Sequence, residues 1–407
     1  MNNMVESRSR HHSGHRSGHH SGRHSRRHHS AWRPGKGQWV WFGTAAVALG
    51  VVLFFVRHRE WADFYALHIY PRWSGAMSWL TGWIPFSLDE VLVVAAVSGI
   101  ALCLARFRRR WMALLALLMW LVVWFYAGWG INYFRSDIYA RAGVRPVVRG
   151  SVEIGEAAGT AESGEAAGTV GAAEFGESAE SAGSVGSPAD ARFEAFLRAY
   201  TSGLNESYVP VETIDRKALA LEIKEYYRSV PERFGLAEPK PWQRPKRLIF
   251  SRLYSGVGVL GFVGPFFNEI QVNADVPPVE YPFTYAHELS HLLGVSSEAE
   301  ANYWAFKACV ASAEPAFRYA GLQSLLPHVW SSARRTLPEE EFRLWTESLR
   351  PEVVAALQAE QDYWADLYSP LIGRIQHRLY DHFLKSNNIP SGTANYSEVI
   401  QLILSLD

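Results

Sequence analysis

The 407-residue chain has little cysteine, because Cys103 and Cys309 are the only two. Domains held together by disulfides need several cysteine pairs, so the sequence excludes a disulfide framework. Cys103 also lies in an apolar run long enough to enter a membrane, and we therefore expect it not to pair with Cys309. The cysteines give no information about the redox compartment.

Charged residues are absent from three long apolar runs, the second of which follows the acidic pair Asp89-Glu90. Apolar runs of this length are typical of transmembrane helices. Residues 60–88, between the first two runs, are rich in aromatic side chains and suit the headgroup level of a bilayer. Spans without internal charge offer no ion pathway, which argues against a transporter or channel. The sequence predicts a membrane domain at 38–135 with three spans, at about 39–56, 89–105 and 111–129.

Lysine and arginine are absent from residues 150–189, which are mainly Gly, Ala, Ser and Glu and contain GEAAGT twice. This composition predicts a flexible acidic linker. Residues 1–37 are rich in Arg, His, Ser and Gly and contain eight of the fifteen histidines. They have too few apolar residues to form a core, so we expect a disordered basic tail that touches anionic lipid. A nucleic-acid partner is compatible with this charge but is not expected beside three spans.

The distribution of basic residues predicts an orientation in the membrane. Eight lie in the tail, four at 106–110, and three between the first two spans. Because basic loops stay on the cytoplasmic side, we expect a cytoplasmic N-terminus and a C-terminal domain outside the cytoplasmic membrane. The four arginines after the third span, at 135, 141, 145 and 149, favour the opposite orientation.

Residues 191–407 have the mixed pattern of a globular domain. Helices are predicted at 191–202 and 213–230, then over most of 302–388, with a last helix from Ser397. Between them the sequence predicts three short strands, the last of them an edge strand: 247–251, 256–263 and 266–274. The expected fold class is a membrane-anchored α+β protein, whose mainly helical domain has a small sheet.

The segment from His287 to His291 has the pattern His-Glu-x-x-His. On a helix, positions i and i+4 lie on one face, so both imidazoles can reach one metal ion. Glu288 projects toward the same pocket, where it can accept a proton from an activated water rather than bind the metal. The pattern predicts a metal site with Glu288 as the general base.

A third ligand is expected on the next helix, which Ser296 or Ser297 can cap with Glu298 in its first turn. The segment from Glu298 to Asn302 resembles the Glu-x-x-Ala-Asp element of glutamate-type zincins. The resemblance implies that Glu298 binds the metal, and asparagine replaces the aspartate of that element. Glu300 is the alternative ligand, and the two glutamates point about 200° apart on a helix, so both should not bind one ion.

Four stretches of the chain resemble an uncharacterised bacterial family of three-span membrane proteins with a zincin-like domain of unknown function. They are residues 84–88, 129–135, 282–302 and 380–387. The resemblance covers 39–407 except the acidic linker, and it implies a zincin-like metallopeptidase domain at 191–407. One Zn²⁺ per chain would then be held by His287, His291 and Glu298 in a protein of the bacterial cytoplasmic membrane.

We therefore expect a zinc metalloendopeptidase that acts on a peptide or a membrane-protein substrate beside the lipid bilayer. The strand at 266–274 is a candidate edge for an extended substrate, or else an ordinary edge strand. Tyr380, His377 and His382 are candidates for stabilising the oxyanion, with structural roles as the alternative. The rival function is a metal-binding membrane scaffold or sensor without turnover, against which the intact Glu288 counts. These ligand types do not distinguish zinc from similar divalent ions.

Overall fold

The computed structural model describes residues 36–147 and 188–407. The predicted basic tail and acidic linker therefore lie, except for two residues at one end of each, outside the described residues. In the described part, helices dominate and the strands form one small sheet. This agrees with a mainly helical protein that has a small sheet.

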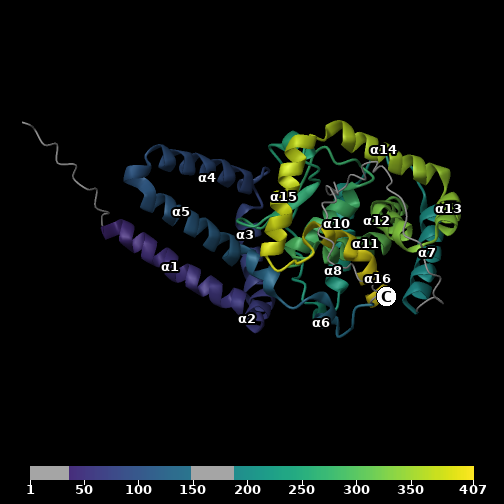
Figure 1. Ribbon diagram of the computed structural model, residues 1–407, viewed down its shortest axis with the longest axis horizontal. Helices are drawn as coiled ribbons and strands as arrows, with labels where there is room; N and C mark the ends of the chain where they lie inside the picture. Colours follow the sequence, from purple (N-terminus) through teal and green to yellow (C-terminus); the bar gives the residue numbers. More distant parts are fainter. Residues whose placement is uncertain (1–35, 148–187) are drawn as a thin grey trace, which may run out of the picture.

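Three helices of the described chain are long and apolar enough to cross a membrane, in agreement with the three predicted spans. They lie side by side and extend away from the larger body of the molecule (Figure 1). Many of their apolar side chains are exposed, as helices surrounded by lipid require. These helices are α1 (Lys36–Arg57), α4 (Leu88–Ala105) and α5 (Phe107–Gly128).

Short helices join the spans to the larger body. The aromatic-rich segment between α1 and α4 is helical almost throughout, and the chain after α5 forms two further short helices. These elements are α2 (Arg59–Phe64), the π-helix η1 (Tyr65–Ile69), α3 (Tyr70–Thr81), the 3₁₀-helix η2 (Gly130–Phe134) and α6 (Ile138–Ala142).

The larger body is built mainly from helices around a central group of three, α10, α11 and α12, which pack against one another. The two helices predicted before the sheet and the helical stretch after Asn302 are confirmed. The main helices are α7 (Pro188–Ser207), α8 (Arg216–Ser229), α10 (Tyr281–Leu292), α11 (Glu298–Val310), α12 (Pro315–Thr336), α13 (Glu339–Ser348), α14 (Pro351–Leu367), α15 (Pro370–Ser386) and α16 (Val399–Leu406). Short 3₁₀ turns lie at η3 (Glu232–Phe234) and η4 (Gly392–Glu398).

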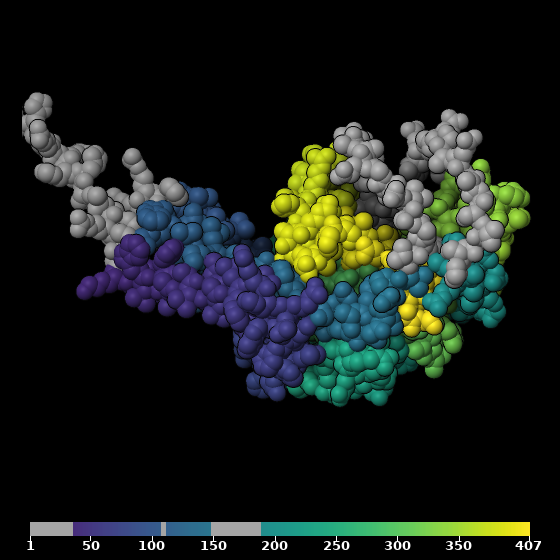
Figure 2. All heavy atoms as spheres, turned by 60° about the horizontal axis from the view of Figure 1, so that its bottom comes forward, coloured from purple at the N-terminus to yellow at the C-terminus, as the bar shows by residue number. Residues whose placement is uncertain are grey.

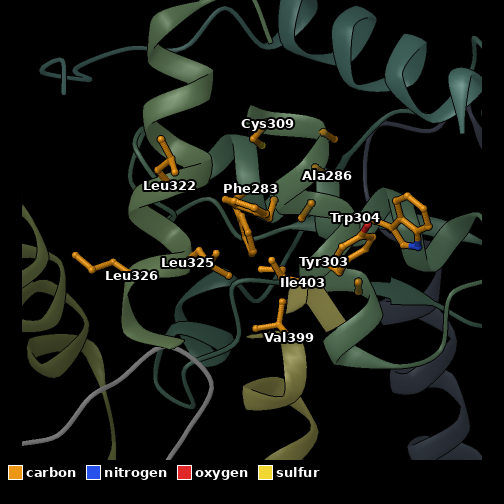
Figure 3. Packing of buried hydrophobic residues seen from close by; sticks show 14 of the residues in the cluster. Phe283, Ala286, Tyr303, Trp304, Cys309, Leu322, Leu325, Leu326, Val399 and Ile403 are labelled. Carbon is orange, nitrogen blue, oxygen red and sulfur yellow. The ribbon is translucent and has the colours of Figure 1, made fainter. Parts of the chain in front are cut away.

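The core lies between these central helices and the last helix of the chain. Figure 3 shows Phe283 of α10, Leu325 of α12 and Ile403 of α16 converging on one apolar cluster. All three side chains are buried. The cluster holds α10 rigidly, which matters because α10 carries the His-Glu-x-x-His segment.

The small sheet has the strand order β1-β3-β2, with β1 parallel and β2 antiparallel to β3. The strands are β1 (Lys246–Arg247), β2 (Gly261–Gly264) and β3 (Glu269–Val272). The central position of β3 shows that the predicted edge strand at 266–274 was wrong. The polar residues of β3 are buried with partners, Glu269 with Lys246 and Gln271 with Ser87, so the polar positions did not mark a solvent face.

The other two strands are shorter than predicted. Only the beginning of the predicted 247–251 strand pairs, because the chain then turns into α9 (Ser251–Ser255). Of the predicted 256–263 strand, only the part from Gly261 pairs with β3. β2 is therefore an edge strand of the described sheet, and it lies against α10.

The first turn of α4 is bonded directly to the sheet region. The Glu269 carboxylate accepts hydrogen bonds from the backbone N–H of Leu88, at 2.8 Å, and from the Lys246 ammonium, at 2.5 Å. The Glu90 carboxylate accepts from the backbone N–H groups of Ile249 and Phe250. Figure 2 shows the purple and blue surface of the spans continuing into the larger body. The spans and the body thus form one connected structure.

Candidate metal centre

The two histidines of the motif lie on one face of the buried helix α10. Their Nε2 atoms are 3.0 Å apart, and both side chains are buried. The helix begins with Pro282 in its first turn, where the missing N–H costs no hydrogen bond. It ends just before Gly294, whose φ of 100° suits glycine and turns the chain toward α11. The local sequence thus sets both the helix and its reversal.

Glu298, the first residue of α11, completes the group. Its Oε2 atom lies 3.1 Å from the Nε2 of His287 and 3.2 Å from that of His291. Ligand atoms around a tetrahedral zinc ion lie about 3.3 Å apart when each bond is about 2.0–2.1 Å. The three atoms therefore have the spacing that one such ion needs, and His287, His291 and Glu298 could hold a metal ion.

Both imidazoles are oriented by acceptors on the side away from Glu298. The Nδ1 of His291 lies 2.8 Å from the carbonyl oxygen of Val295, which can only accept, so this nitrogen donates and Nε2 is left as a ligand. The Nδ1 of His287 donates likewise to the Oδ1 of Asn302, at 2.8 Å. The Asn302 amide nitrogen faces the carbonyl of Tyr396, at 3.5 Å, which fixes its orientation. The asparagine therefore supplies the acceptor that orients His287.

Glu300, the alternative ligand, points away from the two histidines. Its carboxylate pairs with the Arg141 guanidinium in a buried ion pair and accepts a hydrogen bond from the indole of Trp304, at 3.1 Å. Ser297 caps α11 through the backbone N–H of Glu300. Residues two positions apart on a helix differ by a rotation of about 200°, which directs Glu298 to the histidines and Glu300 to Arg141.

Two tyrosines from the end of the chain close the site. The Tyr380 hydroxyl of α15 donates to the Oε1 of Glu298, at 2.6 Å. Burial raises the pKa of Tyr380 well above its ordinary value, so this hydroxyl stays protonated. The ring of Tyr396 stacks on His287 at a centroid distance of 6.5 Å and an angle of 4°. Glu298 is thus held through both oxygens.

Glu288 is buried beside the group without belonging to it. Its Oε2 atom has no hydrogen-bond partner among the described residues. Burial raises the pKa of Glu288 to about 8, against an ordinary value of 4.5. On its open side lies Gly261 of β2, where a Cβ atom would come within 2.9 Å of the Glu288 Cγ and Oε1 atoms. A buried carboxyl oxygen without a partner, beside three candidate ligand atoms, is suited to accept a proton from an activated water.

Within the His-His-Glu group, the strongest electrostatic interaction joins His291 and Glu298. Burial opposes protonation of His291, but the Glu298 carboxylate outweighs it and raises the pKa of this imidazole to about 9. Burial alone would raise the pKa of Glu298, yet the two histidines hold it well below its ordinary value. Burial lowers the pKa of His287. The buried carboxylate of Glu298 is therefore stabilised by a positive charge beside it, which a proton on His291 or a bound cation can supply.

Residues near the spans support the C-terminal end of α10, which carries the second histidine, and the turn that follows it. The Trp129 indole donates to the carbonyl of His291, at 3.1 Å. The Tyr70 hydroxyl donates to the carbonyl of Leu292, at 2.8 Å, and Arg135 donates to the carbonyl of Gly294, at 3.2 Å. These carbonyls end a buried helix and need donors from elsewhere. The membrane part therefore helps to build the site.

Sequence reasoning named some of these residues and missed others. Of the three candidates for the oxyanion, Tyr380 bonds with Glu298, whereas no hydrogen bond joins His377 or His382 to that carboxylate in the described chain. Sequence reasoning missed Tyr396 and gave Arg141 no part in the site. Each lies about a hundred residues or more from its partner on α10 or α11, so no local pattern could reveal it. Trp129, in contrast, lies in the 129–135 stretch, which is one of the four that carry the family resemblance.

The fold and the site together define a mostly helical protein with three helices of membrane-spanning length and a buried His-His-Glu group. The chain belongs to the family described as a protein of unknown function, DUF3810, whose model matches residues 65–161 and 177–404. No curated protein and no solved structure matches the chain. The match confirms a family of unknown function, and it begins after α1. The family's description names no activity, so zinc binding and peptide hydrolysis stay predictions.

Proposed function

We propose that this protein is a membrane-bound metallopeptidase whose metal ion, zinc by its ligand types, is held by His287, His291 and Glu298. One observation carries the proposal: the buried carboxyl group of Glu288, whose Oε2 atom has no hydrogen-bond partner among the described residues, lies beside three ligand atoms spaced for one ion. Two imidazoles and a carboxylate leave a fourth position for water or substrate. The membrane setting follows from the three apolar helices.

In the proposed reaction, water adds to the carbonyl carbon of a peptide bond, the C–N bond breaks, and a proton reaches the leaving nitrogen. A bound zinc ion would polarise the carbonyl and acidify the water. Glu288 accepts the proton from the water and delivers it to the amine, leaving a carboxylate and an amine as products. Tyr380 donates to Glu298 and so orients a ligand, and Asn302 does the same for His287.

The edge strand β2 is the place where an extended substrate is expected to bind. It pairs on one side with β3, and no other strand of the described sheet covers its second side. Gly261 of this strand lies against Glu288, so a peptide added along β2 would pass beside the general base. This places on β2 the role that the sequence had suggested for 266–274.

The rival is a scaffold that holds the ion only for folding. A structural site gains nothing from a buried carboxyl oxygen without a hydrogen-bond partner, because burying such an atom costs free energy. An acid–base role accounts for it. This difference favours the hydrolase.

The test uses the full chain in lipid nanodiscs, loaded with Zn²⁺, freed of excess metal and incubated with a mixture of unstructured peptides. Metal content is measured by mass spectrometry, and cleavage by the appearance of new peptide termini. We expect about one zinc per chain and cleavage in the wild type. Glu288→Gln should keep the zinc and lose cleavage, and Glu298→Gln should lose the zinc.

Glu341→Gln, on the exposed surface of α13, is the matched control and should behave as the wild type. A folded wild-type chain that binds no divalent ion would overturn the proposal. Cleavage that persists unchanged in Glu288→Gln would remove the general base and the mechanism with it. Zinc bound without cleavage of any peptide, including segments of membrane proteins, would overturn the peptidase and favour the rival function, a metal-binding scaffold.

A further inference from the structure

Helix α15 exposes its apolar face. Leu371, Ile372, Ile375 and Leu379 are 48–68% exposed. Their spacing of one, three and four residues places them on one stripe of the helix surface. A helix that packs on a protein core normally turns such a stripe inward, so this one is arranged for another apolar surrounding.

The opposite face of α15 is already used by the protein. Gly373 and Leu384 are buried. Tyr380, on that face, donates its hydroxyl to Glu298 at the metal centre. The exposed stripe therefore cannot turn inward without removing Tyr380 from the site.

The ends of α15 are fixed at the level where the spans meet the larger body. At its C-terminal end, Phe383 packs edge-to-face on Phe125 in the last turn of α5, with ring centroids 5.8 Å apart. Just beyond this end, Asn387 accepts a hydrogen bond from Tyr126 of the same turn, at 2.8 Å.

The N-terminal end is tied to the same level through α9. The backbone N–H of Ser369 donates to the carbonyl of Gly256, directly after α9. The residues that precede α9, Ile249 and Phe250, are bonded to Glu90 in the first turn of α4. Both ends of α15 are thus linked to the same end of the span bundle, and Figure 1 shows α15 running across the direction of the spans.

Other exposed apolar side chains occur at this level. Trp83 is 75% exposed and lies just before α4, and Ile249 is 53% exposed beside the first turn of α4. Tryptophan at such a position is typical of the interface between lipid and water. In Figure 2 the yellow surface of the C-terminal residues rises beside the place where the blue helices join the body. The stripe on α15 therefore lies at the same height as other apolar side chains at the lipid-facing end of the body.

We propose that α15 is an interfacial helix, which lies in the plane of the bilayer surface with its apolar stripe in the lipid. The occupant of the stripe is the same membrane that the three spans cross. Arg374 and Arg378, both exposed, directly precede Ile375 and Leu379 and lie along the edge of the stripe, where they reach lipid phosphates. This inference is independent of the proposed peptidase activity, because it uses only the placement of α15 and its exposed side chains.

The test measures the depth of one residue in the membrane. Ile375→Cys is introduced in the full chain together with Cys103→Ala, while Cys309 is buried and stays. A spin label at this cysteine is examined in nanodiscs of phosphatidylethanolamine and phosphatidylglycerol. Relaxation by oxygen, which concentrates in lipid, is compared with relaxation by a water-soluble nickel complex. Leu379→Cys is the second position, in case the first variant does not fold.

Leu344→Cys is the matched control, because Leu344 is an equally exposed leucine, at 52%, on α13 at the far end of the body (Figure 1). We expect the ratio of oxygen to nickel relaxation to be severalfold higher at position 375 than at 344. Equal ratios would place the stripe in water and overturn the proposal. A label shielded from both reagents would also overturn it, since protein would then cover the stripe.

Discussion

Asn302 and the carbonyl of Val295 decide how the two histidines of the site are used. Each accepts a hydrogen bond from an Nδ1 atom, and each thereby leaves an Nε2 lone pair directed at the carboxylate of Glu298. The two acceptors differ in kind. The Val295 carbonyl is part of the backbone, whereas the Asn302 amide is a side chain that a substitution can remove. The contribution of one acceptor can therefore be measured alone.

We expect Asn302→Leu to weaken metal binding by about 10–100-fold, because His287 loses the partner that orients its ring. The affinity is measured by competition with a chelator of known strength, using the full chain in nanodiscs. Asn302→Asp is the matched control and should bind at least as tightly as the wild type, since a carboxylate is the stronger acceptor. An Asn302→Leu affinity equal to that of the wild type would show that packing alone orients His287.

A second buried carboxyl group makes the stability depend on pH. Glu280, just before α10, accepts hydrogen bonds from the Trp364 indole at 2.8 and 3.0 Å, and burial raises its pKa to about 7. Burial and the nearby Glu280 carboxylate raise the pKa of Glu360 as well. A raised pKa in the folded state means that its contribution to stability is complete below the ordinary pKa of about 4.5 and is lost as the pH rises through about 7.

The free energy of unfolding should therefore fall by roughly 1–3 kcal/mol between pH 5 and pH 8 through these groups. In Glu280→Gln this fall should be smaller, because one of the two acids no longer titrates. Thermal unfolding of both chains at several pH values gives the comparison. Parallel curves for the two chains would show that Glu280 does not contribute.

At the scale of elements, the contact between β2 and α10 sets the position of Glu288, the proposed general base. The two elements approach so closely that no side chain fits at Gly261, since a Cβ there would lie 2.8 Å from the carbonyl oxygen of Gln271 and 2.9 Å from Glu288. The carbonyl belongs to the neighbouring strand and cannot move away. β2 would therefore have to move slightly against β3, and the side chain of Glu288 would have to shift as well.

Under the proposed function, Gly261→Ala should lower the rate of peptide cleavage at least tenfold while zinc content stays near one per chain. The displaced group is the base and not a ligand. Gly203→Ala is the control, since a Cβ at this helix position meets only the Leu322 Cδ1 at 4.0 Å, and alanine there should stabilise the chain by about 0.5–1 kcal/mol. Unchanged cleavage in Gly261→Ala would contradict the position given to Glu288.

At the scale of the whole molecule, the spans and the body meet through buried charge. Lys246 and Glu269 form an ion pair whose side chains are 5% and 1% exposed, and both also bond to the membrane part, at Thr81 and Leu88. Removing one partner of a buried pair leaves the other charge without compensation. The junction is therefore sensitive to single substitutions.

Lys246→Met should destabilise the chain by about 3–5 kcal/mol, and adding Glu269→Gln should recover much of the loss. Denaturation of the solubilised full chain measures both. Lys240→Met, which breaks the more exposed pair with Glu238, should cost no more than about 1 kcal/mol. Equal effects of the two lysine substitutions would mean that the junction is not buried in solution.

The sequence predicted the parts of this molecule that depend on local patterns. The three apolar helices and the His-Glu-x-x-His helix follow from runs and spacings of fewer than about twenty-five residues. Glu298 was named, with Glu300 as the alternative, because the segment from Glu298 to Asn302 resembles a short element of glutamate-type zincins, and the structure places Glu298 beside the two histidines. The central place of β3 in the sheet was not predicted. Its polar residues Glu269 and Gln271 bond to Lys246 and Ser87 inside the protein, whereas the alternating pattern had suggested that they face water. Arg141 and Tyr396 could not be found, because only the fold brings them to Glu300 and His287.

The hydrogen bond from Trp129 to the carbonyl of His291 sets the distance between the site and the lipid. Trp129 is the first residue after the third helix of membrane-spanning length, so a single side chain separates the end of that helix from His291, a proposed metal ligand. Under the proposed function, the site is therefore held near the bilayer surface and meets polypeptides there. Encounters with membrane-protein substrates would then take place by diffusion within the membrane plane, and the height of a peptide bond above the surface would select substrates before their sequence does.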